Sequence, residues 1–234
     1  MQRHIITTAD GSKTIQIEEW NEQYHSIHGA IQEANHVYIA HGLLFSLETN
    51  GFTKTDKPIT DEFGTLSILE IGLGTGLNSF LTLLEAEKYP VNIYYQGVEA
   101  FPISEEEQGA LNYVKELKVD HKAALFNRLH SSAWEQEVEL TPHFTLHKQQ
   151  LLFMDITDKN KFDLIYFDAF GARVQPELWT VAIFQLMYDA LKTKGVLVTY
   201  AAKGSVRRAM QEVGFSVEKL PGPPGKREML RAIK

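Results

Sequence analysis

The chain of 234 residues contains no cysteine. This absence excludes disulfide bonds, metal sites built on thiolates and a cysteine nucleophile. The sequence also lacks a basic segment followed by an apolar stretch at its start, and no apolar run approaches the length that spans a bilayer. It has no internal repeat and no low-complexity tract. We therefore expect a soluble, cytoplasmic protein without membrane association and without a metal site.

Positive charge is outnumbered overall: 23 Lys and Arg stand against 30 Asp and Glu, which gives a formal net charge of −7. This balance argues against nonspecific adhesion to nucleic acid, and we expect no DNA partner. The distribution is uneven, however: from residue 201 onward eight Lys and Arg face three Asp and Glu, so this tail carries +5 and the rest carries −12. Such a tail is typical of a solvated face, and it is also typical of a local phosphate-binding patch on an acidic protein.

Glycine is concentrated in residues 66–78, LSILEIGLGTGLN, where an apolar run ends in Glu70. Gly72, Gly74 and Gly76 follow at alternate positions, and a Leu-rich, helix-like segment comes next. Glycine permits φ > 0 and lets backbone N–H groups approach a ligand at the positive end of the following helix. The strand before the loop and the helix after it predict a nucleotide-type ligand loop. The dinucleotide pattern is G-x-G-x-x-G, whereas this G-x-G-x-G form resembles the first motif of S-adenosylmethionine-dependent methyltransferases.

Strand-like and helix-like segments alternate along the rest of the chain. This order predicts an α/β, Rossmann-like, doubly wound and mostly parallel sheet, and two final strands without a helix between them predict an antiparallel edge hairpin. We expect one compact unit, with a hairpin and helix cap over residues 1–50 and the core over residues 51–234. The predicted strands cover residues 5–8, 14–17, 66–70, 91–98, 144–147, 162–167, 196–200, 215–220 and 227–233. The predicted helices cover residues 29–41, 121–131, 176–191 and 206–213, and another begins at the Ser104/Glu107 capping box. A loop is predicted over residues 50–64.

Two further strands end in a carboxylate, at Glu99 and at Asp168. Ligands of open α/β sheets bind at the carboxyl ends of the strands, where Glu99 would accept hydrogen bonds from ribose hydroxyls. NAD-binding folds carry an acid at the same place, so Glu99 alone does not identify the cofactor. Asp168 is either a loop cap or a group beside the reacting atoms. Phe170 and Trp179 offer a flat wall for a base, or they pack in the core.

Five segments together give a more specific resemblance. They are YHSIHGAIQEANHVYI (24–39), LEIGLGTGLN (69–78), DLIYFDAF (163–170), QPELWT (175–180) and the stretch from VRR to PGPPGKREMLRA (206–232). With these segments the chain resembles the bacterial tRNA 5-methylaminomethyl-2-thiouridine methyltransferases over residues 24–232. The last segment is the most specific, because generic methyltransferases share the glycine loop but not VRR followed by PGPPGKREMLRA.

The resemblance implies methyl transfer from S-adenosylmethionine to the exocyclic amine of 5-aminomethyl-2-thiouridine at the tRNA wobble position. Many relatives are fused to an FAD-dependent oxidoreductase; we expect this chain to be the stand-alone form, without FAD, and separate enzymes to supply the aminomethyl substrate. Asp168 would hold the amine and take up its proton. The implied cofactor-binding residues are Glu70, Gly72, Gly74, Gly76, Asn78 and Glu99, with Tyr24 and Glu33 either closing over the cofactor or merely packing, and Asp155 or Gln149 replacing the usual acid for adenine.

The basic tail suits a tRNA anticodon arm, whose target base must leave its stack to reach a pocket. Two other hypotheses stay open. One is a methyltransferase or aminopropyltransferase acting on a small molecule or protein, and the other is a noncatalytic RNA-binding protein on the same fold. With Phe170 beside the base, the expected tRNA-binding residues are Lys203, Arg207, Arg208, Lys226 and Arg227.

Overall fold

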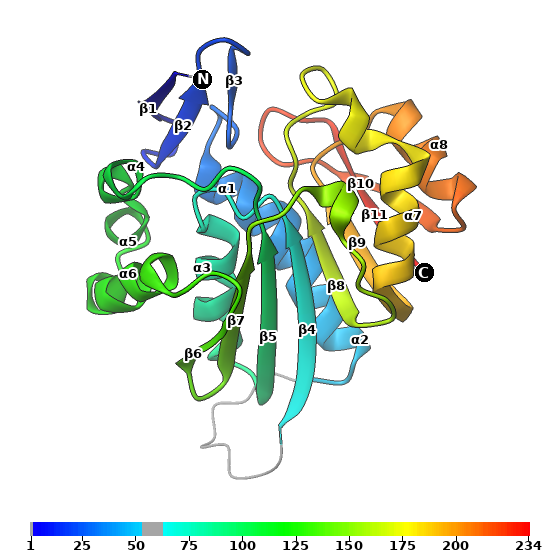
Figure 1. Cartoon of the computed structure of the whole chain (residues 1–234), viewed down its shortest axis with the longest axis horizontal. Helices are drawn as coiled ribbons and strands as arrows, with labels where there is room; N and C mark the ends of the chain where they lie inside the picture. The colour runs from blue at the N-terminus through cyan, green and yellow to red at the C-terminus, as the bar shows by residue number, and fades with distance from the viewer. Residues whose placement is uncertain (1, 53–62) are drawn as a thin grey trace.

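The computed structural model describes residues 2–52 and 63–234, so most of the loop predicted over residues 50–64 lies outside the described residues. Its centre is an eight-stranded sheet whose five middle strands run parallel (Figure 1). The predicted fold class and the antiparallel C-terminal hairpin are confirmed. In spatial order the strands are β10 (Ser216–Pro221), β11 (Glu228–Ile233), β9 (Leu191–Thr199), β8 (Phe162–Phe167), β4 (Gly64–Ile71), β5 (Val91–Val98), β7 (Phe144–Gln149) and β6 (Glu137–Thr141).

Strand β4 lies between β5 and β8, so the strand order reverses there. Strands β4 and β8 are apolar on both faces, because helices cover both sides of the sheet. Ile68 and Ile165, for example, are fully buried on neighbouring strands. The Asp168 N–H donates to the Ile71 carbonyl at 2.9 Å, which holds the carboxyl ends of β8 and β4 together. Ligands of open α/β sheets bind at such a reversal.

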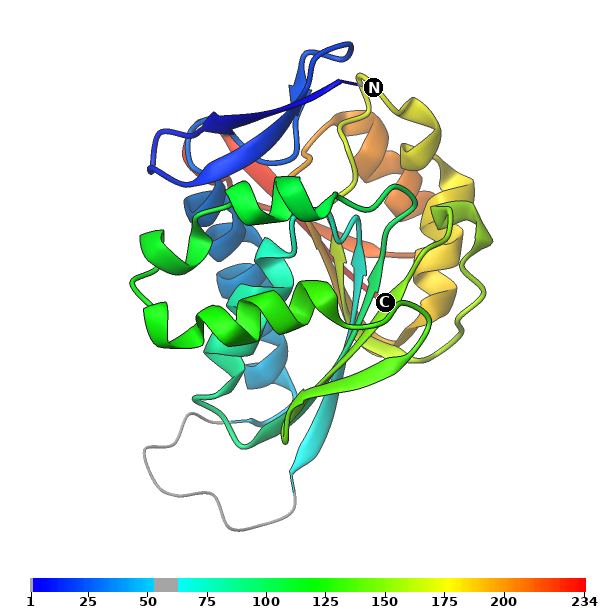
Figure 2. The same ribbon diagram turned by 60° about the vertical axis from the view of Figure 1, so that its left-hand side comes forward.

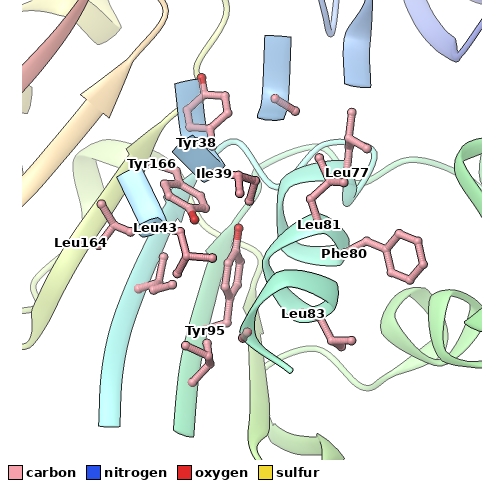
Figure 3. Packing of buried hydrophobic residues seen from close by; sticks show 14 of the residues in the cluster. Tyr38, Ile39, Leu43, Leu77, Phe80, Leu81, Leu83, Tyr95, Leu164 and Tyr166 are labelled. Atoms are coloured by element: carbon pink, nitrogen blue, oxygen red, sulfur yellow. The ribbon is translucent and has the colours of Figure 1, made fainter. Parts of the chain in front are cut away.

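One face of the sheet is covered by a continuous helical segment near the N-terminus and by α3 (Leu77–Ala86). The segment consists of α1 (Ala30–Ala34), the π-helical stretch η1 (Asn35–Leu44) and α2 (Phe45–Thr49). It runs beyond the helix predicted over residues 29–41, because apolar side chains continue to enter the core after that range. Figure 3 shows its side chains against those of the sheet, where the Tyr38 and Tyr166 ring centroids are 5.2 Å apart.

Short helices between β5 and β6 extend this layer, and Figure 2 brings them forward. The predicted capping box is present, since the Ser104 hydroxyl accepts from Glu107 N–H while the Glu107 carboxylate accepts from Ser104 N–H. Helix α5 and strand β6 are not among the predicted elements, because their segments are too short to show a clear period. The helix predicted over residues 121–131 is present and begins with the 3-10 turn η2. The helices are α4 (Glu105–Ala110), α5 (Tyr113–Glu116), η2 (Asp120–Lys122) and α6 (Ala123–Ser131).

The opposite face is covered by α7 (Val181–Ala190) and α8 (Gly204–Glu212). The helix predicted over residues 176–191 is divided: a 3-10 turn, η4 (Pro176–Trp179), precedes α7. The backbone of Thr180 is extended between them, and its hydroxyl accepts from the Ile183 N–H and caps α7. Proline suits the first turn of either helix type, so the sequence pattern did not reveal the break.

The N-terminal hairpin is confirmed and gains a third strand, giving a small sheet of β1 (Arg3–Thr7), β2 (Lys13–Ile17) and β3 (Glu22–Gln23). It lies above the carboxyl ends of the central strands (Figures 1 and 2). The Arg173 guanidinium donates to the Glu22 carboxylate at 2.8 Å and ties this sheet to the loop after β8. Within the described residues, none of the helices is long and apolar enough to cross a membrane.

Candidate active site

A cavity of about 1080 Å³ lies between the small sheet and the carboxyl ends of the central strands. The glycine loop forms part of its floor, and two of its glycines are required by close contacts. A Cβ on Gly72, at φ +87°, would come within 2.8 Å of the Asp168 carbonyl oxygen, and one on Gly74 would come within 3.0 Å of the Tyr24 ring. Only glycine therefore allows the loop to pass so close to both walls.

Glu99 follows β5 and lines the same cavity. Its carboxylate accepts from the Gly74 N–H at 3.1 Å and from the Phe101 N–H at 2.9 Å. These bonds fix the carboxylate against the glycine loop, at the place where the sequence predicted a contact to a ribose. They also show a structural duty that the sequence did not indicate, since Glu99 holds two loops together.

Asp168 follows β8 and sits at the centre of a hydrogen-bonded network. Its Oδ1 accepts from the Tyr38 hydroxyl at 2.6 Å, and its Oδ2 accepts from Asn78 Nδ2 at 2.8 Å. The same Nδ2 donates to Glu70 Oε1 at 2.8 Å, and the Tyr95 hydroxyl donates to Glu70 Oε2 at 2.8 Å. Four elements thus hold the Asp168 carboxyl group in one orientation: η1, α3, β4 and β5.

Burial raises the pKa of Asp168 to about 7, and the nearby negative charge of Glu33 adds to this shift. The hydrogen bonds from Tyr38 and Asn78 and the charge of Lys226 act in the opposite direction. A carboxyl group with a pKa near neutrality can gain and lose a proton at physiological pH. Asp168 therefore has the position and the acidity of a proton acceptor.

Glu70 lies below the cavity and does not line it. Its side chain is fully buried, and burial raises its pKa well above the ordinary value. Its role in this structure is to orient Asn78. The Asn78 amide uses its nitrogen for Glu70 and Asp168, whereas its buried Oδ1 has no hydrogen-bond partner among the described residues. A buried acceptor without a partner is costly, so this oxygen suits a donor on a ligand.

Another wall of the cavity is formed by Glu33, Lys226 and Tyr200. Lys226 Nζ pairs with Glu33 Oε1 and lies 3.8 Å from the centroid of the Tyr200 ring. The Tyr200 hydroxyl donates to the Ala169 carbonyl at 2.8 Å. The structure thus brings Glu33, from the N-terminal segment, and Lys226, from the C-terminal turn, into one pair.

Aromatic side chains form the rest of the inner surface. Phe170 lines the cavity and meets the Tyr24 ring edge to face, with centroids 4.9 Å apart. Trp179 is buried against Phe167, so its contribution is core packing rather than a wall for a base. Four exposed apolar side chains surround this cavity and give it an apolar rim: Ile27, Phe101, Leu152 and Met154.

The structure does not bring all predicted site residues to the cavity. Asp155 is exposed and outside its lining, and Gln149 is likewise outside it, with Oε1 accepting from Gln96 Nε2 at 2.6 Å. Gly76 lines an adjoining cavity of about 650 Å³.

Of the basic tail, Lys203, Lys226 and Arg227 line the main cavity. Arg207 and Arg208 were predicted to bind tRNA as well, but neither lines this cavity. Adjacent residues of one helix point about 100° apart, which excludes that both face it but does not explain why neither does.

Sequence reasoning missed Tyr38, which bonds to Asp168. It also missed three residues of the cavity lining: Tyr200, Arg3 from β1 and Trp20 from the turn between β2 and β3. Tyr38 had a detectable signal, since a tyrosine inside an apolar helical stretch needs a partner for its hydroxyl. Tyr200 directly follows the apolar run of β9, as Glu99 and Asp168 follow β5 and β8. Side chains that follow the carboxyl ends of parallel strands lie at the same edge of the sheet, so the same reasoning could have included Tyr200.

Comparisons with known proteins agree with this geometry. A family model described as S-adenosyl-L-methionine-dependent methyltransferase matches residues 113–234. The tRNA 5-methylaminomethyl-2-thiouridine biosynthesis bifunctional protein MnmC of Hydrogenovibrio crunogenus is 28% identical over 227 residues, which cover 90% of this chain and 31% of that protein. The protein of the same name from Leptospira interrogans is 27% identical over 219 residues, 91% of this chain and 32% of that protein. The chain thus spans about a third of the length of these relatives.

The crystal structure of MNMC2 from Aquifex aeolicus superposes with a TM-score of 0.76 at 24% identity, over 99% of this chain and 69% of that one. This likeness shows the fold. Together these matches confirm the resemblance drawn from the sequence motifs.

Proposed function

Because the chain belongs to the family of S-adenosyl-L-methionine-dependent methyltransferases, we propose that it methylates the exocyclic amine of 5-aminomethyl-2-thiouridine at the tRNA wobble position. The product would be 5-methylaminomethyl-2-thiouridine. The names of the relatives support this acceptor, although the chain spans only about a third of their length. The single observation that carries the proposal is the Asp168 carboxyl group, held between Tyr38 and Asn78 in the wall of the cavity.

The residues around the cavity fit S-adenosylmethionine. The backbone of Gly72 and Gly74 lines the cavity as a cradle, packed closely against Asp168 and Tyr24, and the unpartnered Asn78 Oδ1 suits an ammonium donor. Glu99 would accept from the ribose hydroxyls, and Tyr24 would close the cradle over Gly74. When bound, S-adenosylmethionine supplies an electrophilic methyl group: the amine nitrogen bonds to the methyl carbon while the carbon–sulfur bond breaks and its electron pair stays on sulfur.

The chain's own residues prepare the amine for this transfer. An amine attacks only through a free lone pair, so an acceptor that arrives as an ammonium must first lose a proton. The Asp168 carboxylate accepts that proton, while Tyr38 and Asn78 hold the carboxylate in place. The small sheet forms one side of the cavity, where it would shield the amine from water and help to align it.

The outer part of the cavity suits RNA. Lys203 and Arg227 are exposed and line its mouth, where they would contact phosphates of the anticodon arm. The apolar rim, with Phe101 as its aromatic member, would contact bases unstacked from the loop. A tRNA acceptor also places the protein in the cytoplasm, together with the enzymes that generate the aminomethyl group.

The test is methyl transfer from labelled S-adenosylmethionine into tRNA isolated from cells that lack this protein, followed by nucleoside analysis. We expect the label in 5-methylaminomethyl-2-thiouridine, and about 10²–10³-fold slower labelling with Asp168→Asn. Clear cofactor binding without label in tRNA would refute this acceptor, and small-molecule amines would then be screened.

A further inference from the structure

The cavity already holds an alkylammonium group, that of Lys226. Its Nζ pairs with one oxygen of Glu33 and lies 3.8 Å from the centroid of the Tyr200 ring. The other Glu33 oxygen accepts from the Ser26 N–H at 2.9 Å, which fixes the carboxylate. A carboxylate and an aromatic face are the two groups that best bind an alkylammonium. This wall is therefore built for a primary ammonium group.

The ammonium-binding groups lie beside the proton acceptor. The Tyr200 hydroxyl is bonded to the carbonyl of Ala169, the residue after Asp168. The charges of Glu33 and Lys226 both act on the pKa of Asp168, Glu33 raising it and Lys226 lowering it. A cation between Glu33 and Tyr200 is thus within electrostatic reach of Asp168.

Glu33 is the fixed member of the pair and Lys226 the replaceable one. The Glu33 side chain is 8% exposed and the Lys226 side chain 30% exposed. Lys226 is carried by the turn between β10 and β11, outside any helix or strand. A lysine side chain has a flexible four-carbon stem, so its ammonium can leave while the turn stays in place.

We propose that Glu33 and Tyr200 form the binding site for the ammonium group of the methyl acceptor, and that Lys226 occupies this site until the acceptor displaces it. The proposal rests on the proposed function, because it requires an amine acceptor. It gives Glu33 and Lys226 different roles from those predicted from the sequence, which were closure over the cofactor and phosphate binding.

The displaced Lys226 ammonium moves toward the mouth of the cavity, where Lys203 and Arg227 also lie. The acceptor ammonium gives one proton to Asp168 and becomes a neutral amine. Its nitrogen then bonds to the methyl carbon as the carbon–sulfur bond breaks with both electrons on sulfur. The product is a secondary ammonium, and Asp168 releases its proton to water.

Benzylammonium tests this site without tRNA, because it carries an aminomethyl group on a flat ring. Benzyl alcohol is the neutral matched probe. Calorimetry with protein saturated with S-adenosylhomocysteine measures binding without turnover. We expect Lys226→Met to bind benzylammonium at least tenfold more tightly than the unmodified chain. Adding Glu33→Gln or Tyr200→Leu to Lys226→Met should weaken benzylammonium binding at least tenfold relative to Lys226→Met alone. The affinity for benzyl alcohol should change less than twofold.

Two controls keep the result interpretable. Lys159→Met removes an ammonium that pairs with Asp189, and neither residue lines the cavity, so it should leave benzylammonium binding unchanged. The double variant Glu33→Gln/Lys226→Met removes both charges and leaves no buried charge unpaired, which protects folding. Thermal unfolding followed by circular dichroism confirms that each variant is folded.

The proposal is overturned if Lys226→Met leaves benzylammonium binding unchanged or weakens it. It is equally overturned if Glu33→Gln weakens S-adenosylhomocysteine tenfold and not benzylammonium, because the pair would then belong to the cofactor site. Failure of the proposed function has another signature: tRNA gains no methyl group although benzylammonium binding still depends on Glu33 and Tyr200.

Discussion

At the scale of single residues, the proposed proton acceptor is Asp168. Two donors orient its carboxyl group, and burial raises its pKa to about 7. Hydrogen bonds from Tyr38 and Asn78 favour the ionised form, so burial must outweigh them to give this shift. The result is a group that is ready to accept a proton near neutral pH but is largely protonated in mild acid.

The pH dependence of methyl transfer follows directly. Below pH 7 a growing fraction of Asp168 is protonated and cannot accept the amine proton. We expect log kcat to rise with pH with a slope of about 1 and to level off above about pH 7, the pKa of this group. Asp168→Asn should lower kcat about 10²–10³-fold and remove this slope. Single-turnover rates from pH 5 to 9 measure this slope. An unchanged slope in Asp168→Asn would assign the titration to another group.

Stability should depend on the same carboxyl group. Its pKa is raised from 3.8 to about 7 in the folded chain, so the folded state binds more protons between these values. The stabilisation from the bound proton is complete below about pH 4 and is lost as the pH rises through 7, by at most ~4 kcal/mol in the free energy of unfolding. Asp168→Asn, which has no charge to bury, should therefore gain stability relative to the unmodified chain at pH 8 but not at pH 4.

Urea unfolding at both pH values measures this difference. Asp189→Asn is the matched control, because a hydrogen bond from Lys159 lowers the pKa of Asp189. Its stabilisation has the opposite sign: it is present at neutral pH and lost in acid. An equal gain in both variants at pH 8 would show a general charge effect and not the burial of Asp168.

At the scale of elements, the site depends on how closely the glycine loop approaches the end of β8. The loop after β4 passes Asp168 at the point where the strand order reverses. Helical residues from the N-terminal segment reach the same point, since η1 delivers the Tyr38 hydroxyl. π-Helical turns are frequent at functional sites, and here one places the Tyr38 hydroxyl beside Asp168.

Gly72→Ala tests this approach. The new Cβ would lie within 2.8 Å of the Asp168 carbonyl oxygen, at a φ of +87° that L residues rarely adopt. We expect a loss of ~2–3 kcal/mol in the free energy of unfolding and a strong loss of cofactor affinity. In Gly109→Ala, within α4, the new Cβ meets nothing within 4 Å. This variant should lose no more than ~0.5 kcal/mol in the free energy of unfolding, or gain stability. Similar effects in the two variants would contradict the steric argument.

At the scale of the whole molecule, the basic tail is only partly available to a partner. Lys219 pairs with Glu228, Arg231 pairs with Glu218, and Lys226 pairs with Glu33. Lys203 and Arg227 line the cavity and have no ion pair within residues 2–52 and 63–234. The charge asymmetry of the sequence thus overstates the surface that can meet phosphates.

Salt dependence distinguishes the basic residues that line the cavity from those held in ion pairs. Each phosphate contact adds about 0.7–0.9 to the slope of log K against log salt concentration. We expect Lys203→Ala/Arg227→Ala to weaken tRNA binding and to reduce this slope by about 1.5, while Lys219→Ala leaves it unchanged. Fluorescence anisotropy with an anticodon stem-loop at several salt concentrations gives the slopes. A wild-type slope in the double variant would place the RNA elsewhere.

The sequence by itself determined the elements with a strong local pattern. The apolar runs of β5 and β8, the glycine loop, and the carboxylates at Glu99 and Asp168 were all predictable, because period and strand-end position are local properties. The same reasoning did not reveal the break before α7 and missed the one-turn helix α5, where short segments carry too little pattern.

Only the tertiary structure decided which side chains share the cavity. Tyr38 and Asp168 are 130 residues apart, and Lys226 and Glu33 are 193 apart, so no local pattern links them. Their pairing depends on the η1 segment packing on the sheet and on the C-terminal hairpin pairing with β9. The raised pKa of Asp168 has the same origin, because burial is a property of the assembled fold and cannot be read from the residue or its neighbours in sequence.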